Sequence, residues 1–588
     1  MSRRLACLLA FAACGVATAA DDIEVAPPPR PKVVAKSAAP AETPKRPFGA
    51  RPAAALPKDA MPLTGLSPSK PMFETCEYRY AVGTTNPKCQ AFVDQGLGMY
   101  YSYVWIEAAR SFETALTHDP ECAYAWLMLH RSIEKYGRSG PTVSAAPFTG
   151  AIGGLVAAKL PERVGKSAGD YALAMAQKLM PKANDRERLH IQSRLQEKGM
   201  LPDTKPEDRR KKAAASLDEL LMLHEDDEEG WFWRAQVADD GNAKAVYYKA
   251  VLKINPYHPG ANHELVHFYE NIRRPALGWL FAENYIKSSP GIPHALHMQA
   301  HLAMRIGKWG PTTDWSARAV ELQKEYHKTQ GVKHTEDHQF NHHMETLTRS
   351  LVHDGRFAEA RKIKTEAETD YKYQFRPEWF RMAVAAKEWD EAAKIVDHFR
   401  RSDKSNGAYY AAQLYLEKGD TERARAEVDT LRSLQQTRKT DKQLERRLNE
   451  VQGRFLCQTG AGEAGLKMLK KVVDATKNDF GHHAWGNGAV YMETWGVAAL
   501  EAGSAADAEE AFQEALAHDA GSVRGALGLW ALCDRLGRSD EAARYLKVAQ
   551  RVWAKAAPKD FDALKADMQA RATKVPRPAA TTAAEEGQ

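Results

Sequence analysis

Eleven of the twenty histidines lie between residues 258 and 343, and this concentration marks the one stretch of the chain with an evident capacity for chemistry. They are His258, His263, His267, His294, His297, His301, His327, His334, His338, His342 and His343. Imidazole is a common ligand of transition metals, and it changes charge near neutral pH. The stretch is therefore a candidate site for a metal ion or an anionic ligand.

The motif HExxH stands at residues 263–267, which read His-Glu-Leu-Val-His. On a helix, two imidazoles one turn apart face one zinc ion, and the intervening glutamate activates a water molecule. Glu270 continues the same helix face. One alternative is thus a zinc-dependent hydrolase with Glu264 as its base. The motif fixes only three positions. The metalloprotease families that carry it pack the helix beside a β-sheet, and this sequence has no alternating pattern that predicts a strand.

Two more histidine groups follow along the chain. His294, His297 and His301 are spaced i, i+3 and i+7, so they share one helix face. His338, His342 and His343 open the next repeat, so three neighbouring units could direct imidazoles at one place. The predicted metal ligands are His263, His267, Glu270, His294, His297, His301, His338 and His342, with zinc or another transition metal as the ion. The alternatives are storage or sensing of metal without catalysis, and histidines that serve only packing.

A spacing of small and aromatic residues recurs at the two ends of the chain. Near the start, Gly96 is followed by Ala108, Phe112, Ala115 and Pro120. Near the end the matching residues are Gly496, Ala499, Gly503, Ala508, Phe512 and Ala515. Small residues let one helix nest against another, the aromatic ring fills the gap, and proline stops the second helix. The spacing therefore predicts stacked helical pairs.

These residues resemble the tetratricopeptide repeat, a helical pair of about 34 residues, as found in exported bacterial proteins of that family. The resemblance covers roughly residues 88–555 and implies an all-α solenoid of about eight to ten pairs. It also implies a concave groove, built from the first helices of successive repeats, that binds a protein or peptide partner. Binding is accordingly the expected function, and enzymatic activity the alternative.

The N-terminal residues predict that the protein is exported. Arg3 and Arg4 precede a short apolar run that is typical of a signal peptide over residues 1–20, and Cys14 offers an alternative lipid anchor. A protein of the periplasm or cell envelope is expected, with no span of the membrane after the signal is removed.

The domain prediction continues with a disordered linker rich in Pro, Ala and Lys at 21–72, repeats at 73–136, an inserted loop at 137–166, irregular histidine-rich repeats at 167–345, repeats at 346–574 and a disordered tail at 575–588.

Composition excludes several other classes. With 27% charged residues, 9% aromatic residues and a net charge of +6, the chain is typical of a folded soluble protein and gives no reason to expect nucleic-acid binding. The acidic run at residues 225–229 is expected to be a solvated approach to a helix. Five cysteines remain after the signal, and one bridge among Cys76, Cys89 and Cys122 is plausible in an oxidising compartment.

Overall fold

The computed structural model describes residues 58–137, 168–202, 204–478 and 489–578. Within these ranges the regular elements are helices, with no strand among them, which confirms the all-α prediction. The predicted signal peptide with Cys14 and nearly all of the predicted loop at 137–166 lie outside the described residues. No helix of the described ranges is long and apolar enough to cross a bilayer.

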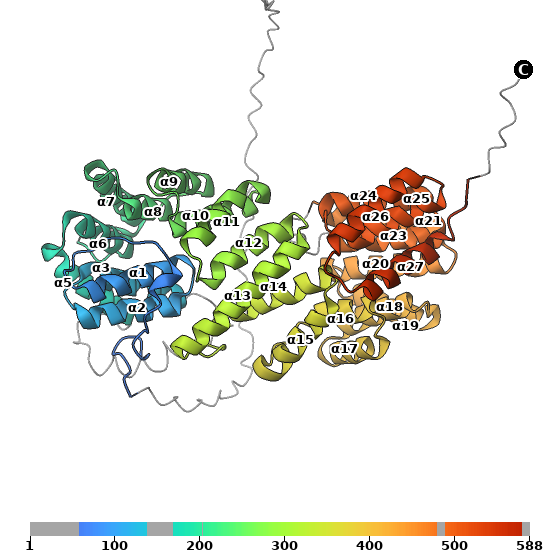
Figure 1. Ribbon diagram of the computed structural model, residues 1–588, viewed down its shortest axis with the longest axis horizontal. Helices are drawn as coiled ribbons and strands as arrows, with labels where there is room; N and C mark the ends of the chain where they lie inside the picture. Colours follow the sequence, from blue (N-terminus) through green and yellow to red (C-terminus); the bar gives the residue numbers. More distant parts are fainter. Residues whose placement is uncertain (1–57, 138–167, 203, 479–488, 579–588) are drawn as a thin grey trace, which may run out of the picture. The chain divides into compact units, whose positions relative to one another are not determined.

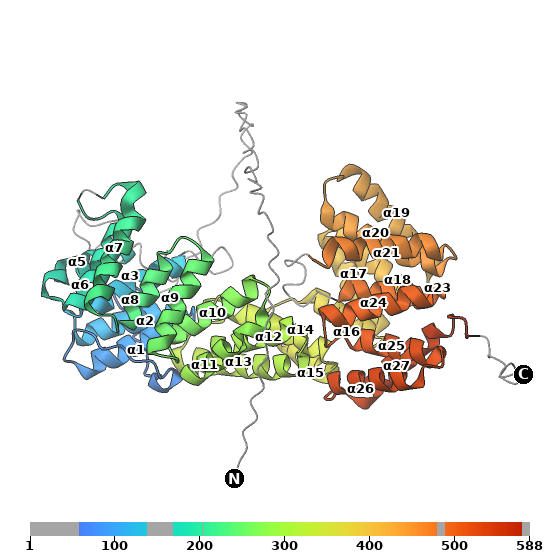
Figure 2. The same ribbon diagram turned by 90° about the horizontal axis from the view of Figure 1, so that it is seen from above.

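Successive helices pack as hairpins, in chain order, as Figure 1 and Figure 2 show. The helices up to the histidine region are α1 (Pro87–Tyr101), α2 (Trp105–His118), α3 (Ala123–Gly137), α5 (Ala168–Leu179), α6 (Asp185–Lys198), α7 (Arg209–Leu223), α8 (Glu228–Gln236) and α9 (Gly241–Ile254). The histidine region forms α10 (Pro259–Asn271), α11 (Trp279–Ser288), α12 (Pro293–Arg305), α13 (Trp309–Gln330), α14 (Phe340–His353) and α15 (Phe357–Glu366). The later helices are α16 (Arg376–Ala385), α17 (Trp389–Ser402), α18 (Lys404–Glu417), α19 (Thr421–Thr437), α20 (Lys442–Gln458), α21 (Gly462–Thr476), α23 (Val490–Ala502), α24 (Ala505–His518), α25 (Val523–Arg535), α26 (Ser539–Val552) and α27 (Pro558–Ala572). These helices make more pairs than the eight to ten expected.

The first hairpin is held by contact between Gly96 on α1 and Phe112 on α2. A Cβ atom at Gly96 would lie only 2.7 Å from Phe112 Cε1, so no larger residue fits without movement of the ring. Phe112, Ala108 and Ala115 are all fully buried. The structure shows the predicted packing, in which small residues allow the two helices to approach closely and the Phe112 ring fills the space between them.

The C-terminal copy repeats this packing. A Cβ atom at Gly496 would lie 2.5 Å from Phe512 Cε1, and one at Gly528 on the following helix α25 would lie 2.4 Å from the same ring. Phe512 therefore joins three successive helices, α23, α24 and α25. Such three-helix contact is how a tetratricopeptide-like pair stacks on the next pair, and the chain is a solenoid of such pairs.

The predicted linker at 21–72 extends too far toward the first helix. Residues 58–72 pack against α2, where Glu113 accepts hydrogen bonds from the backbone N–H groups of Leu63 (2.6 Å) and Thr64 (2.7 Å). Met61 and Leu63 are buried. Composition alone cannot reveal this, because the acceptor lies about fifty residues further along the chain. The predicted tail at 575–588 likewise begins too early, since Val575 is buried and its carbonyl accepts from Arg535 Nε at 2.7 Å.

The cysteines of the described residues are five buried free thiols, and no bridge joins them. The bridge expected among Cys76, Cys89 and Cys122 is therefore not present in the structure. Cys89 and Cys122 nevertheless lie within hydrogen-bond reach of one another across the first repeat.

Candidate functional site

Three helices carry the histidines that come together. His263 and His267 lie on α10, His294, His297 and His301 on α12, and His342 and His343 on α14. Proline stands at the first turn of both α10 and α12, where its missing N–H group costs nothing. The helices α10, α12 and α14 are the first helices of consecutive hairpins (Figure 1), and their facing sides place the imidazoles in two groups.

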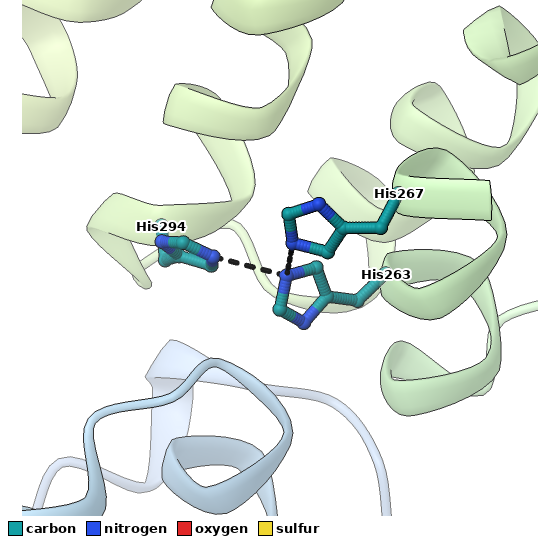
Figure 3. A group of neighbouring side chains, drawn as sticks. All are labelled: His263, His267 and His294. Carbon is teal, nitrogen blue, oxygen red and sulfur yellow. Dashed lines mark hydrogen bonds between the residues drawn. The ribbon is translucent and has the colours of Figure 1, made fainter. Parts of the chain in front are cut away.

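The first group, here called the first triad, consists of His263, His267 and His294 (Figure 3). The Nε2 atom of His263 lies 3.1 Å from Nε2 of His267 and 3.0 Å from Nε2 of His294. One ring nitrogen from each residue lies within 4.8 Å of the other two, a separation that a single metal ion can bridge. The prediction that these three side chains could share an ion fits this arrangement.

The outer ring nitrogens of the first triad are held by other groups. Nδ1 of His263 donates to the carbonyl oxygen of Tyr101 at 2.6 Å, which leaves a lone pair on its Nε2 atom. Nδ1 of His267 lies 3.6 Å from Glu270 Oε2, which favours a proton on that nitrogen too. His263 and His267 therefore present two lone pairs to each other, and only a proton or a cation between them makes this contact favourable.

His294 donates a hydrogen bond to His263 but does not relieve the contact between His263 and His267. The Gln339 amide donates to Nδ1 of His294 at 3.2 Å, so the proton of His294 sits on Nε2 and points to Nε2 of His263. Gln339 Oε1 is buried and has no hydrogen-bond partner. The same amide nitrogen donates to the carbonyl oxygen of Ser102 at 3.1 Å. A half-turn that lets Oε1 accept from Nδ1 of His294, and so makes Nε2 of His294 available to a metal ion, therefore gives up that hydrogen bond.

Burial keeps two of these imidazoles, those of His263 and His294, neutral. Burial first, and then the neighbouring His267, hold the pKa of His263 well below its ordinary value. The pKa of His294 is lowered in the same way, by burial and then by His263. Neutral imidazole is the form that binds metal, so His263 and His294 do not have to lose a proton to bind an ion at neutral pH.

The second group, here called the second triad, consists of His297, His301 and His342. The Nε2 atoms of His301 and His342 lie 3.4 Å apart, and again one nitrogen of each residue lies within 4.8 Å of the other two. The ring of His297 packs 4.3 Å from that of His301 and 4.7 Å from that of His342, measured between centroids. The sequence named all three residues but could not separate them from the first triad.

Glu270 lies between the two triads and belongs to neither group, so its role as a metal ligand stays a prediction. Its Oε2 atom lies 3.6 Å from Nδ1 of His267, and its Oε1 atom lies 3.4 Å from Nδ1 of His301 and 2.7 Å from Arg305 Nη2. Burial opposes its ionisation, but His301, His267 and Arg305 outweigh that effect and hold its pKa well below the usual range. Glu270 is a charged carboxylate that orients imidazoles.

Glu264, the base of the hydrolase alternative, is partly buried and accepts a hydrogen bond from the Tyr103 hydroxyl at 3.0 Å. The Tyr103 ring also lies 4.4 Å from the His263 ring and 5.7 Å from the His294 ring. Tyr103 has a φ of 60°, which is unusual for a residue with a side chain, and it occupies the turn between α1 and α2. Nothing in the local sequence signalled this residue, because it reaches the site from about 160 residues away.

His338 does not join the other histidines, and its prediction as a metal ligand is not supported by its position. Its ring stacks on Trp105 at 5.0 Å with an interplanar angle of 5°. Other histidines of the region also have separate partners: His258 caps α10 through the N–H group of Ala261, and His327 lies 2.8 Å from Asp337 Oδ2. Part of the histidine concentration is therefore structural, as the packing alternative expected.

The acidic run at 225–229 is only partly solvated. Glu229 is fully buried and accepts hydrogen bonds from Tyr78 (2.8 Å), Tyr124 (2.8 Å), Trp233 Nε1 (3.0 Å) and the Tyr101 hydroxyl. The expectation of a solvated approach is wrong for this residue, because four donors replace its water: Tyr101 on α1, Tyr124 on α3, Trp233 on its own helix α8, and Tyr78 in the segment before α1. Tyr101 links this network to the first triad, since its carbonyl oxygen accepts from His263.

A cavity of about 270 Å³ lies among the C-terminal repeats. Its walls come from α16, α18, α20, α23, α25 and α27, and most of these are first helices of their hairpins. Aromatic side chains such as Phe380, Tyr409 and Trp553 line it together with charged ones. Glu417 there pairs with Arg454 (2.6 Å) and Arg571 (2.9 Å), so part of the charge is compensated within the wall.

Comparison with known proteins adds little beyond the fold. No family model matches the chain, and no curated protein matches it. Among solved structures, PilW, described as a widely conserved type IV pilus biogenesis factor, is 14% identical over 44% of this chain and 97% of that chain, with a TM-score of 0.26. The P58(IPK) TPR domain is 10% identical over 79% and 99%, with a TM-score of 0.21, and the APC/C hetero-tetramer Cut9-Hcn1 is 11% identical over 83% and 96%, with a TM-score of 0.26. Values this low carry no functional inference, and the description of the repeats rests on their own packing.

Proposed function

We propose that this tetratricopeptide-like scaffold binds a transition metal ion through His263, His267 and His294. The observation that carries the proposal is the convergence of three Nε2 atoms, two of which, on His263 and His267, carry lone pairs because Tyr101 and Glu270 hold their outer nitrogens. Such outer partners fix ring orientation and are a regular feature of histidine metal sites. Three neutral nitrogen ligands suit zinc, copper, nickel or iron, and leave one position for water or another ligand.

Metal content of single variants tests this proposal. After dialysis against zinc, we expect the His263→Ala variant and the His294→Ala variant each to hold one zinc ion per chain fewer than wild type. His338→Ala is the matched control, because His338 is a histidine of the same region that stacks on Trp105 outside the triad. Unchanged zinc content in both triad variants, with helical circular dichroism retained, would contradict the proposal.

The zinc hydrolase remains an alternative use of the same ion, with Glu264 as base. A catalytic carboxylate must face the metal-bound water, whereas Glu264 accepts from the Tyr103 hydroxyl. Zinc-loaded protein incubated with a peptide library distinguishes the two roles. Hydrolysis that disappears in Glu264→Gln but not in Tyr103→Phe supports the enzyme, and bound zinc without hydrolysis supports the binding role alone.

Binding of a protein partner is a second candidate function, favoured by the cavity in the C-terminal repeats. Helical repeats commonly present such a groove to other proteins, and a polar wall with aromatic patches suits a peptide segment. The signal peptide predicted from the sequence supports a partner of the cell envelope. We expect Lys387→Glu at the cavity rim to reduce capture of an envelope protein that wild type retains, and Lys394→Glu, an exposed lysine outside the cavity, to leave it unchanged. Equal capture by both variants would argue against this groove.

A further inference from the structure

We infer that the second triad, His297, His301 and His342, binds a second metal ion, so that the histidine region is a two-ion centre. This inference rests on the proposed function of the first triad and adds a separate site to it. The ligand class is again a transition metal ion that prefers nitrogen, such as Zn²⁺, Co²⁺ or Cu²⁺.

The position of the second triad favours an ion over ordinary packing. His297 and His301 are almost fully buried, and His342 closes the group from α14. The Nε2 atoms of His301 and His342 face each other at 3.4 Å. Because Nδ1 of His301 lies 3.4 Å from a charged carboxylate oxygen of Glu270, its proton belongs on that nitrogen and its Nε2 atom carries a lone pair. As at His263, a carboxylate or carbonyl on the outer nitrogen turns a lone pair toward a neighbouring imidazole nitrogen.

An unsatisfied nitrogen in the same place gives a second, independent observation. Nδ1 of His297 is buried and has no hydrogen-bond partner. A buried polar atom usually has a partner, and one without it calls for an explanation such as an ion. His343 adds to this, since its Nδ1 atom donates to Gln323 at 2.6 Å while its buried Nε2 atom has no partner, and its ring packs 4.0 Å from that of His297.

Glu270 joins the two triads into one centre. It faces Nδ1 of His267 in the first triad and Nδ1 of His301 in the second, so one carboxylate orients a ligand of each ion. Its negative charge also offsets part of the repulsion between two cations. Two positive charges repel an ion at the second triad. One is Arg305, which pairs with Glu270 at 2.7 Å, and the other is Arg349, which lies near His342. We therefore expect the second triad to bind its ion more weakly than the first.

Zinc stoichiometry of the full chain tests the inference, measured by equilibrium dialysis and elemental analysis. We expect two ions per chain in wild type and in His338→Ala, and one ion in His342→Asn, in His297→Asn and in His263→Ala. One ion in wild type that is lost in His263→Ala but kept in His342→Asn would overturn the second site and leave the proposed function standing. No bound ion in wild type would overturn both.

Glu270→Gln provides a test that does not remove any ligand. An uncharged amide of the same shape should weaken both sites together, by about 10- to 100-fold in each dissociation constant, because outer-shell partners typically have effects of this size. Glu264→Gln is the matched control on the same helix, since Glu264 contacts Tyr103. The Nδ1 atoms of His267 and His301 are oriented by Glu270 instead. Weakening confined to the first ion would overturn the shared role of Glu270.

Discussion

Nδ1 of His263 donates to the carbonyl oxygen of Tyr101 at 2.6 Å, and this bond ties α10 to the end of α1 across 162 residues of sequence. It directs the lone pair of Nε2 toward His267 and His294. The metal-binding geometry is therefore built by the stacking of distant hairpins, and an ion at the triad should in turn stabilise that stacking.

Zinc should raise the thermal stability of the protein through the first triad. An ion that binds only the folded chain stabilises it by about 2.7 kcal/mol when its concentration is 100 times the dissociation constant. We expect a higher unfolding midpoint by circular dichroism with zinc than with chelator in wild type and in His338→Ala, and a smaller shift in His294→Ala. An equal shift in His294→Ala would show that the zinc effect arises elsewhere.

Gly96→Ala should destabilise the first hairpin. The new methyl group would overlap the Phe112 ring, whose nearest atom lies 2.7 Å from the Cβ position, and overpacking of this kind costs about 1–3 kcal/mol. Gly241→Ala is the matched control, because nothing lies within 4 Å of its Cβ position. Urea unfolding should show a loss of stability in the first variant and little change or a small gain in the second.

The sequence predicted the helical pairs correctly where local spacing decides them. Gly96 contacts Phe112, and Gly496 contacts Phe512, as their spacing indicated, because the two partners of each contact lie within one repeat. The burial of residues 58–72 was missed for the opposite reason, since their acceptor Glu113 belongs to a helix that the linker reaches only after folding.

For the site, the sequence identified the ligand types but not their grouping. Helix periodicity places His294, His297 and His301 on one face, yet the structure divides them between two triads. His294 groups with His263 and His267 of α10, whereas His297 and His301 group with His342 of α14. Tyr103, Gln339 and the orienting role of Glu270 depend on contacts between repeats, which no local motif encodes.

Glu229→Gln should destabilise the N-terminal repeats. The carboxylate accepts hydrogen bonds from three tyrosines and a tryptophan. Hydrogen bonds to a charged group contribute about 1.5–3 kcal/mol each. Because the amide of Gln would turn N–H groups toward some of these donors, at least one of the hydrogen bonds would be lost. Glu225→Gln, an exposed residue of the same acidic run, is the control. Chemical unfolding should show a loss of about 2 kcal/mol or more in the first variant only. Equal stability of both variants would contradict the anchoring role of Glu229.

His353 should make folding less favourable at acid pH. Its ring stacks on Trp309 at 4.0 Å, and burial, followed by Arg381 and Arg349, lowers its pKa to about 3. The unfolded chain binds a proton at about pH 6.5 and the folded chain does not, so this contribution is complete above that pH and is lost as the pH falls from 6.5 toward 3. His353→Phe keeps a ring at this position and removes the titration. We expect the stability of wild type relative to His353→Phe to fall by about 1 kcal/mol per pH unit between pH 6 and 5, because the other titrating groups cancel in the difference. Urea unfolding of metal-free protein measures it, and a difference that stays constant over this range would mean that His353 is protonated in the folded state.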